Sequence, residues 1–538
     1  MIACLEKLFF FDGEGDVICR IVQRSAFVAA SIVPFGLATV LSALVFFGGA
    51  GQFVGHDLSF YGLPQVGEHL ASGCVSFALL CLVFVGLAMA ARRMHGSAPL
   101  WLALVLAIVA VVARLALVGL FWQDAAPPVD NGFAWLRAIG EPSPEDYHRT
   151  IPIWMNYSLF LRPLAIFFGR SYGVDLVAGV LFDGVSAFLV FLVAERMSGR
   201  MDVPVLAVAL YALNPAFVAY SLCGTPEHVA ITAFLGSAYL FCRMVEADSV
   251  RGTFLFAVLC GLAMGVGNAV KPLFPLLGTA MVLAVLLWAP RKGTRALVAL
   301  GGLAVVFAVQ FCVVRTTTAA TEKTFDCKLS GKQSVSHMLV VGLNRQGEGQ
   351  LHIGELSRTV QNGLKAGLPM EEAARIGRER VLEDWRGHYG SIPGFLLRKS
   401  IWGWQDFNTP LYYFRRHNAP PGGGEEEKLA GLAGRLRSLA WWSLTGPLPV
   451  ANMFLYFCVM LLGTGAMASC AFDRKEKSVL DVFGCMLIMG FFFMIMLIEA
   501  QSRYKCLVLP FVFVFAARFA VELSERALKD RGGGEDAC

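Results

Sequence analysis

Long apolar runs separated by short polar stretches dominate the chain. A helix needs roughly 20 apolar residues to cross a bilayer, and it satisfies every backbone N–H and C=O within its own segment. About twelve segments fit this pattern and are predicted to cross the membrane. They are Ser25–Gly49, Cys74–Ala91, Trp101–Phe121, Val174–Ala194, Val203–Tyr220, Val229–Cys242, Phe254–Val266, Leu273–Ala289, Leu297–Val314, Val450–Cys470, Val479–Ile498 and Cys506–Val521. The pattern therefore predicts an all-α, polytopic membrane protein, in which the shorter run Ile153–Phe168 could cross or lie in the interface.

Basic residues mark alternate connections between these segments. Arg20 and Arg24 precede the first segment, and the sequence Arg92-Arg93-Met94-His95 follows the second. Later basic connections contain Arg196 and Arg200, Arg243 and Arg251, Arg291, Lys292 and Arg295, and Arg474, Lys475 and Lys477. Because Lys and Arg collect in cytoplasmic loops, both termini are expected in the cytoplasm. Two polar regions, Trp122–Tyr172 and Arg315–Gly446, then share the outer face.

This alternation divides the chain into five parts. Residues 1–98 hold an N-terminal helix pair, and residues 99–314 form a transmembrane core with its first outer loop at 122–172. Residues 315–446 form an extracytoplasmic region between late helices, followed by C-terminal transmembrane helices at 447–522 and a cytoplasmic tail at 523–538. The outer region is expected to be mostly helical, because Glu371–Tyr389 has the spacing and charge of an exposed helix. The aromatic run Ile392–Phe414 suits the lipid headgroup layer.

Composition agrees with a membrane protein. The chain is 56% hydrophobic and 16% charged, whereas soluble domains are typically about 25% charged. The net charge of +5 is explained by the cytoplasmic loops and gives no reason to expect a nucleic-acid partner. Met1–Arg24 has no cleavable signal pattern. The 14 cysteines show no metal-ligand spacing, although Cys223 and Cys327 are both expected outside and could form a disulfide.

Candidate chemistry is confined to acids and bases at helix ends. The GxxxxGK[ST], HExxH and GxSxG motifs are absent, so nucleotide hydrolases, zinc peptidases and serine hydrolases lack their signatures. In the first outer loop, Asp130 could act as a general base toward an acceptor hydroxyl, and Asp124 is its rival. The alternative for either residue is a helix cap or a solvated charge. The loop acids Glu141, Glu145 and Asp146 are expected only to solvate or cap.

Three further polar groups are expected on the same face: Thr225–His228, Asn268–Pro272 and Glu499–Lys505. Arg503 and Lys505 suit a lipid-linked phosphate, which Arg binds bidentately, but both could simply snorkel at the interface. Glu227 beside His228 is expected chiefly as a favourable charge at a helix N-terminus.

The order of these pieces resembles the GT-C superfamily of integral-membrane glycosyltransferases, particularly the protein mannosyltransferase and aminoarabinose transferase branch. The resemblance covers roughly the last four fifths of the chain and rests on five segments. They are PPVDNGFAWLRA with Asp130, Tyr147–Gly169, Leu213–Phe217 followed by Tyr220, Ser221 and Glu227, Pro393–Trp404 with Lys399, and Glu499 with Arg503-Tyr504. Two features depart from the pattern: Asn131 stands where many relatives have a second acid, and the helix pair before Arg92 is extra.

This resemblance implies transfer of a sugar from a polyprenyl-phosphate donor to a glycan, lipid or protein acceptor on the outer face, usually with inversion. Inversion requires one base and a stabilised phosphate leaving group. The expected roles are Asp130 as base, with Asp124 or Glu227 as alternative or accessory acid. Arg503, Lys505 and Lys271 are expected to bind the phosphate, and Glu499 and Tyr504 to orient them. No cofactor beyond the lipid-linked sugar is expected. The lone Asp130 argues against a divalent metal, which oligosaccharyltransferase-type relatives nevertheless require.

The alternative function is a multi-pass transporter or lipid flippase. Charges at mid-membrane depth favour transport, and Arg114 and Asp183 are such charges. The remaining apolar segments are nearly free of charge at that depth, which favours chemistry at the interface. A structural platform for assembly would explain the outer loops but not the clustered acids and bases.

Overall fold

A computed structural model describes most of the chain as helix. The described residues are 66–94, 96–121, 137–140, 152–169, 171–288, 293–329, 340, 342–345, 370–404, 432–472, 478–498 and 502–532. Within these ranges every regular element is a helix, and eight helices are long and apolar enough to cross a membrane. The all-α polytopic prediction is therefore confirmed, while the predicted segment Ser25–Gly49 lies outside the described residues.

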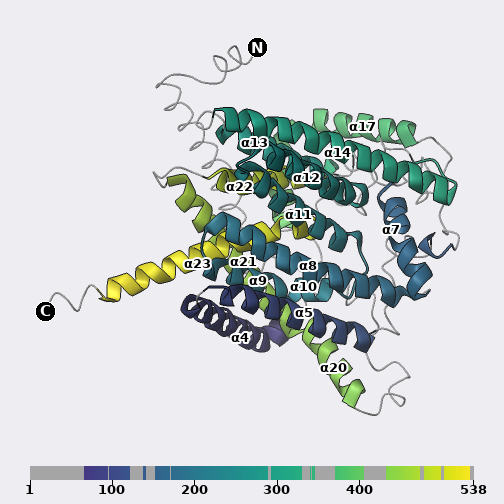
Figure 1. The fold of residues 1–538 in the computed structure, drawn as a ribbon. Coiled ribbons are helices and arrows are strands. Elements are labelled where there is room, and N and C mark those ends of the chain that lie inside the picture. Colours follow the sequence, from purple (N-terminus) through teal and green to yellow (C-terminus); the bar gives the residue numbers. More distant parts are fainter. Residues whose placement is uncertain are drawn as a thin grey trace.

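The eight long apolar helices are α4 (Val66–Arg93), α5 (Ala98–Phe121), α8 (Tyr172–Ser198), α11 (Pro226–Glu246), α12 (Val250–Val270), α14 (Thr294–Phe325), α21 (Pro447–Phe472) and α22 (Val479–Leu497). Two shorter apolar helices, α9 (Asp202–Ala212) and α13 (Phe274–Trp288), lie among them. The others are α7 (Pro152–Phe168), α10 (Pro215–Tyr220), α17 (Met370–Gly387), α18 (Ile392–Trp404), α20 (Leu432–Thr445), α23 (Leu509–Gly532) and the short 3₁₀ helices η6 (Tyr389–Ser391) and η8 (Ser502–Leu507). Figure 1 shows the long helices side by side, with α7 at one end of the bundle and α23 extending from the other.

The predicted crossing Val203–Tyr220 is two helices, α9 and α10. Asn214 caps α10, because its side-chain oxygen accepts hydrogen bonds from the backbone N–H groups of Ala216 at 3.0 Å and Phe217 at 3.2 Å. Pro215 follows at the first helical position, where it lacks the N–H needed to continue α9. The apolar run hid this break because periodicity alone does not register a cap.

The helix predicted to end at Val314 continues to Phe325 as α14. It ends at Asp326, which adopts a left-handed conformation (φ 47°) and directs its backbone N–H to the carbonyl of Glu322. The extra turns carry Thr321 to the end of the bundle where α7 lies, so a residue predicted to belong to the outer region becomes part of a long helix.

Two glycines bring α12 and α14 into close contact. Gly261 and Gly265 lie four residues apart on one face of α12. A Cβ added to Gly261 would meet the backbone oxygen of Val306 at 2.7 Å, and one added to Gly265 would meet Val313 Cβ at 2.5 Å. This is the small-residue spacing that lets helix backbones approach each other in membranes. The position of the end of α12 therefore depends on both glycines.

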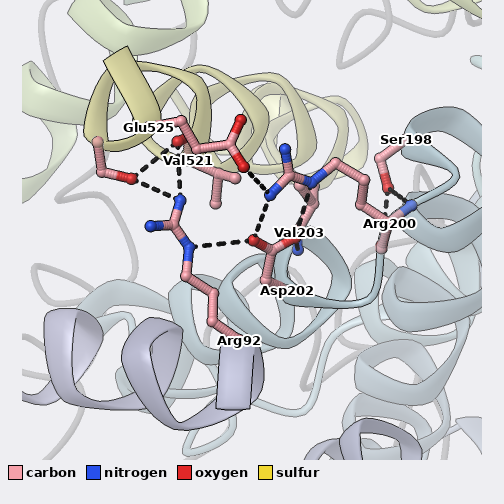
Figure 2. Close-up of polar contacts among 8 residues, drawn as sticks. Arg92, Ser198, Arg200, Asp202, Val203, Val521 and Glu525 are labelled. Atoms are coloured by element: carbon pink, nitrogen blue, oxygen red, sulfur yellow. Dashed lines mark hydrogen bonds and ion pairs between the residues drawn. The ribbon is translucent and has the colours of Figure 1, made fainter. Parts of the chain in front are cut away.

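Two of the connections predicted to be cytoplasmic, those with Arg92 and Arg200, meet the C-terminal helix α23 at one end of the bundle (Figure 2). Arg92, at the end of α4, donates from Nε to Asp202 Oδ2 at 3.3 Å and from Nη2 to the carbonyl of Val521 at 2.9 Å. Arg200 bridges Asp202 and Glu525, with its Nη2 at 2.7 Å from both carboxylates. Residues from α4, α9, α23 and the α8–α9 turn thus form one polar network, which agrees with the predicted grouping of these ends.

Acid should weaken this network. Burial raises the pKa of Asp202, but the hydrogen bonds and charge of Arg200 and a hydrogen bond from Arg92 outweigh it and lower the pKa overall. The hydrogen bond from Arg200 likewise lowers the pKa of Glu525. Both groups stabilise the fold above their unfolded pKa of about 4, and this contribution is lost as pH falls through the lower folded values. When wild type is unfolded thermally at pH values from 6 to 3, its free energy of unfolding should decrease as the pH falls. Asp202→Asn should reduce this decrease by about 1 kcal/mol. Asp248→Asn, which removes an exposed partner of Arg295, should keep the wild-type pH dependence, and an equal effect of the two variants would contradict the assignment.

Gly265→Ala should destabilise the bundle, because the new methyl group overlaps Val313. Overpacking of this kind typically costs about 1–3 kcal/mol. The control is Gly119→Ala in α5, where a Cβ meets no atom within 4 Å and alanine favours the helix. Thermal unfolding in the same detergent should show a loss for Gly265→Ala only. Equal melting temperatures for the two variants would refute the close contact.

Candidate functional site

The opposite end of the bundle collects polar side chains from five elements: α7, the start of α8, the start of α11, the end of α12 and η8. The sequence expects all of these positions on one face. Asp124, Asp130 and Glu499 lie outside the described residues. Arg503 belongs to η8, but its side chain also lies outside the described part. The roles predicted for these four residues therefore remain predictions.

Glu227 and Lys271 form a buried ion pair. Lys271 Nζ lies 2.5 Å from Glu227 Oε1, and the two side chains are 9% and 2% exposed. Glu227 occupies the first turn of α11, where the helix dipole favours a negative charge. Lys271 follows the last residue of α12, where the dipole favours a positive charge. Lys271 Nζ also lies 4.9 Å from the centre of the Tyr504 ring. Three residues singled out from distant parts of the sequence are thus in contact.

Lys505 lies deeper, inside an aromatic enclosure. Its side chain is completely buried, and Nζ donates to the Tyr456 hydroxyl at 3.1 Å. The rings of Tyr456 and Trp404 lie 4.7 Å and 5.6 Å from the same nitrogen, an arrangement that stabilises a cation. Because these rings shield Lys505, Lys271 is the better placed of the two lysines to meet a ligand.

Helix α7 supplies residues that the sequence analysis did not single out. The Asn156 side chain donates to the carbonyl of Ala269 at 2.9 Å and accepts from Thr321 Oγ1 at 2.8 Å. The Tyr157 hydroxyl donates to Asp175 Oδ1 at 2.7 Å. Burial first, and then the charge of Asp175, raise the pKa of Tyr157, so the hydroxyl retains its proton. The sequence feature that could have identified these residues is the polar run Asn156-Tyr157-Ser158 within an apolar helix.

A buried Asp183–His228 pair holds the turn before α11. His228 Nδ1 lies 2.9 Å from Asp183 Oδ1, while Nε2 lies 3.1 Å from the carbonyl oxygens of both Tyr220 and Cys223. Both ring nitrogens face acceptors, so an imidazolium with two N–H donors satisfies the geometry. Ser221 Oγ donates to Asp183 Oδ2 at 2.9 Å. His228 therefore fixes the backbone that leads into Glu227.

Arg114 also belongs to this buried environment. Its Nη2 donates to the carbonyl of Ala212 at 3.2 Å, and its charge acts favourably on Asp183. The two mid-depth charges that suggested a transporter thus have partners within the protein. Arg114 Nε and Nη1 are buried and have no hydrogen-bond partner among the described residues.

An apolar groove runs beside the site. It has a volume of about 660 Å³ and lies between α7, α8, α12 and α14. Its lining includes Leu159, Pro163 and Leu181, with Asn156 and Thr317 as polar members, and it reaches Ala269 and Val270, directly before Lys271. The groove can therefore hold an alkyl or isoprenoid chain while a polar head lies near Lys271.

The sequence left open a metal site and a disulfide between Cys223 and Cys327. Within the part of the chain that the structure describes, no group of three His, Cys, Asp or Glu side chains could hold a metal ion. Cys223 and Cys327 do not form a disulfide. Cys223 is buried, and burial followed by the charge of Glu227 raises its pKa to about 12.

Residues 157–314 match the family model described as dolichyl-phosphate-mannose-protein mannosyltransferase. A comparison of the chain with curated proteins gave no match. The matched segment begins in α7 and ends in α14, so it includes Glu227 and Lys271. Over residues 157–314 the match confirms the resemblance to GT-C membrane glycosyltransferases, and it supports a membrane glycosyltransferase of that type.

Loss of one member of the Glu227–Lys271 pair should destabilise the protein more than loss of both. Lys271→Met leaves a buried carboxylate without its cation, which typically costs about 3–5 kcal/mol. Glu227→Gln/Lys271→Met removes both charges and should recover much of that loss. Thermal unfolding of the wild type, both single variants and the double variant measures the coupling between the two residues. Strictly additive changes would show that the side chains are not paired.

Proposed function

We propose that the protein transfers a sugar from a polyprenyl-phosphate donor to a glycan, lipid or protein acceptor of the cell envelope, on the outer face of the membrane. The observation that carries this proposal is the Glu227–Lys271 pair, which lies within the segment matching the mannosyltransferase family. An apolar groove between helices reaches Val270, directly before Lys271. An amphiphilic donor needs this combination, because its isoprenoid tail requires an apolar path and its phosphate requires nearby cations.

The proposed reaction is a single displacement with inversion. An acceptor hydroxyl oxygen attacks the anomeric carbon, the bond from that carbon to the phosphate oxygen breaks, and polyprenyl phosphate leaves. Asp130 takes the hydroxyl proton, with Asp124 as its rival. Arg503 and Lys271 stabilise the charge that develops on the phosphate, since preorganised cations favour a transition state in which charge builds up. Lys505 has a lesser part because it is enclosed by Trp404 and Tyr456.

The positions of Glu227 and Tyr504 suggest supporting roles. Glu227 contacts Lys271 directly, and the Tyr504 ring faces the same ammonium group. Both can hold Lys271 in place while a phosphate approaches, and Tyr504 precedes the enclosed Lys505 in η8. We assign to Glu499 the role of orienting the Arg503 side chain. The sidedness follows from the positive-inside pattern, with both termini in the cytoplasm.

Transport is the weaker proposal. A flippase would use intramembrane charges along its path, whereas Arg114 and Asp183 are fully buried and contact protein groups. The shared polar end of the bundle favours chemistry at the membrane surface.

The purified full chain, incubated with radiolabelled polyprenyl-phosphate mannose, glucose or aminoarabinose and membrane acceptors, should transfer label. Asp130→Asn should lower the rate by about 100- to 10,000-fold, the usual contribution of a general base. Asp124→Asn tests the rival assignment, and Asp146→Asn is the control because that loop acid is expected only to solvate or cap. Full turnover by folded Asp130→Asn and Asp124→Asn proteins would overturn the catalytic assignment. Absence of transfer from every donor by the wild type would refute the proposed function.

A further inference from the structure

Three buried oxygen atoms beside the Glu227–Lys271 pair have no hydrogen-bond partner among the described residues. They are Asp175 Oδ2, Thr225 Oγ1 and Asn268 Oδ1. Asp175 lies in the first turn of α8, Thr225 occupies the N-cap position of α11 without a side-chain cap hydrogen bond, and Asn268 lies in the last turn of α12. Buried polar atoms are almost always paired, so three such atoms in one region require an explanation.

The region is compact on the side of α8 and α11. Gly224, directly before Thr225, packs so closely on Asp175 that a Cβ at Gly224 would overlap the unpaired Oδ2. The backbone N–H of Gly224 donates to the Tyr172 hydroxyl at 2.7 Å. The turn therefore holds the backbone of Gly224 against the unpaired Oδ2 of Asp175, and Thr225 follows directly in the chain.

Helix α7 connects this corner to the end of α12. Its neighbouring residues Asn156 and Tyr157 bond to Ala269 and Asp175, respectively. Ala269 follows Asn268, so the third unpaired oxygen belongs to the same polar end. Tyr157 occupies Asp175 Oδ1 and leaves Oδ2 with its lone pairs available.

These three oxygen atoms favour a ligand that donates hydrogen bonds. A carboxylate oxygen and an amide oxygen accept only, and the threonine hydroxyl can accept as well as donate. A sugar presents several O–H donors on a rigid ring, which matches a set of fixed acceptors. A phosphate presents acceptors and negative charge, and the Asp175 carboxylate would repel it. The donor's phosphate therefore lies toward Lys271, and its sugar lies toward Asp175.

We propose that Asp175, Thr225 and Asn268 form a subsite for the hydroxyl or amino groups of the transferred sugar. The inference rests on the proposed function and adds the residues that recognise the sugar. Tyr157 is a positioning residue, because it holds the carboxylate through Oδ1 without facing the sugar itself.

The test compares Asp175→Asn with wild type in the purified full chain, using polyprenyl-phosphate mannose, glucose and aminoarabinose. The donor that supports the fastest transfer is then compared with its deoxy or deamino analogues, each lacking one polar group. Thr225→Val is the second variant, because it removes an unpaired hydroxyl with little change in volume. Ser237→Ala is the control, since Ser237 is buried in α11 and donates within its own helix to Ala233. Thermal unfolding establishes that each variant is folded.

Asp175→Asn should lower kcat/KM about 10- to 100-fold with the complete donor, as expected for loss of a hydrogen bond to a charged group. The loss should be much smaller with the one analogue that lacks the matching group, and Thr225→Val should show the same coupling with another analogue. If the effect of the substitution depends on a sugar hydroxyl, the residue contacts a neutral sugar. If it depends on an amino group, the residue contacts an aminosugar. A purely structural role predicts equal losses with all donors, and this result in both variants would overturn the subsite.

Binding separates this inference from the proposed function. Polyprenyl-phosphate sugars should protect wild type from thermal unfolding, and Asp175→Asn should weaken that protection while Ser237→Ala keeps it. Donor-specific protection without transfer would refute the glycosyltransferase proposal and leave the subsite supported. Transfer with no donor-specific change in either variant would refute the subsite and leave the glycosyltransferase proposal standing.

Discussion

The buried pair of Asp183 and His228 is the interaction on which the candidate site depends. It joins α8 to α11 inside the apolar bundle, where separated charges would be strongly unfavourable. The imidazolium faces a carboxylate on one side and two backbone carbonyls on the other. Those carbonyls belong to the turn that enters α11, so the pair fixes the backbone from which Gly224, Thr225 and Glu227 project. Breaking it would release both the turn and the charges beneath it.

Polar contacts at the two ends of the bundle have different characters. At the end with Arg92 and Glu525, the two arginines and Glu525 are partly exposed, Asp202 is buried, and these charges share one network (Figure 2). At the end with Glu227 and Lys271, the ion pair is buried and nearby acceptors lack partners. The first arrangement suits attachment of helix ends near water. The second has the unsatisfied groups and shielding expected of a site that binds a polar molecule.

Much of the fold could be predicted because apolar runs report burial in lipid directly. The limits of α8, α12, α21 and α22 lie within a few residues of the predicted segments. The break at Asn214 was missed because a capping side chain and a proline interrupt a helix without changing its hydropathy. Residues on loops were grouped correctly where the charge pattern determined the shared end, as for Glu227 and Lys271. Asp175 was missed because one acid in the first turn of an apolar helix resembles an ordinary N-terminal charge, and its unpaired oxygen becomes evident only with Tyr157 and Gly224 in place.

The close contact of α12 and α14 makes the walls of the apolar groove unequal. Gly261 packs against the backbone of Val306 and Gly265 against the side chain of Val313, so we expect α12 and α14 to move as one rigid unit on that side of the groove. The facing helix α7 contains Pro163, which cannot donate the hydrogen bond that an ordinary residue would give to the carbonyl of Leu159. Leu159 and Pro163 both line the groove. A long chain entering from the bilayer would therefore widen the groove by bending α7 at this weak point, while Asn268 and Lys271 on the stiff side keep their positions.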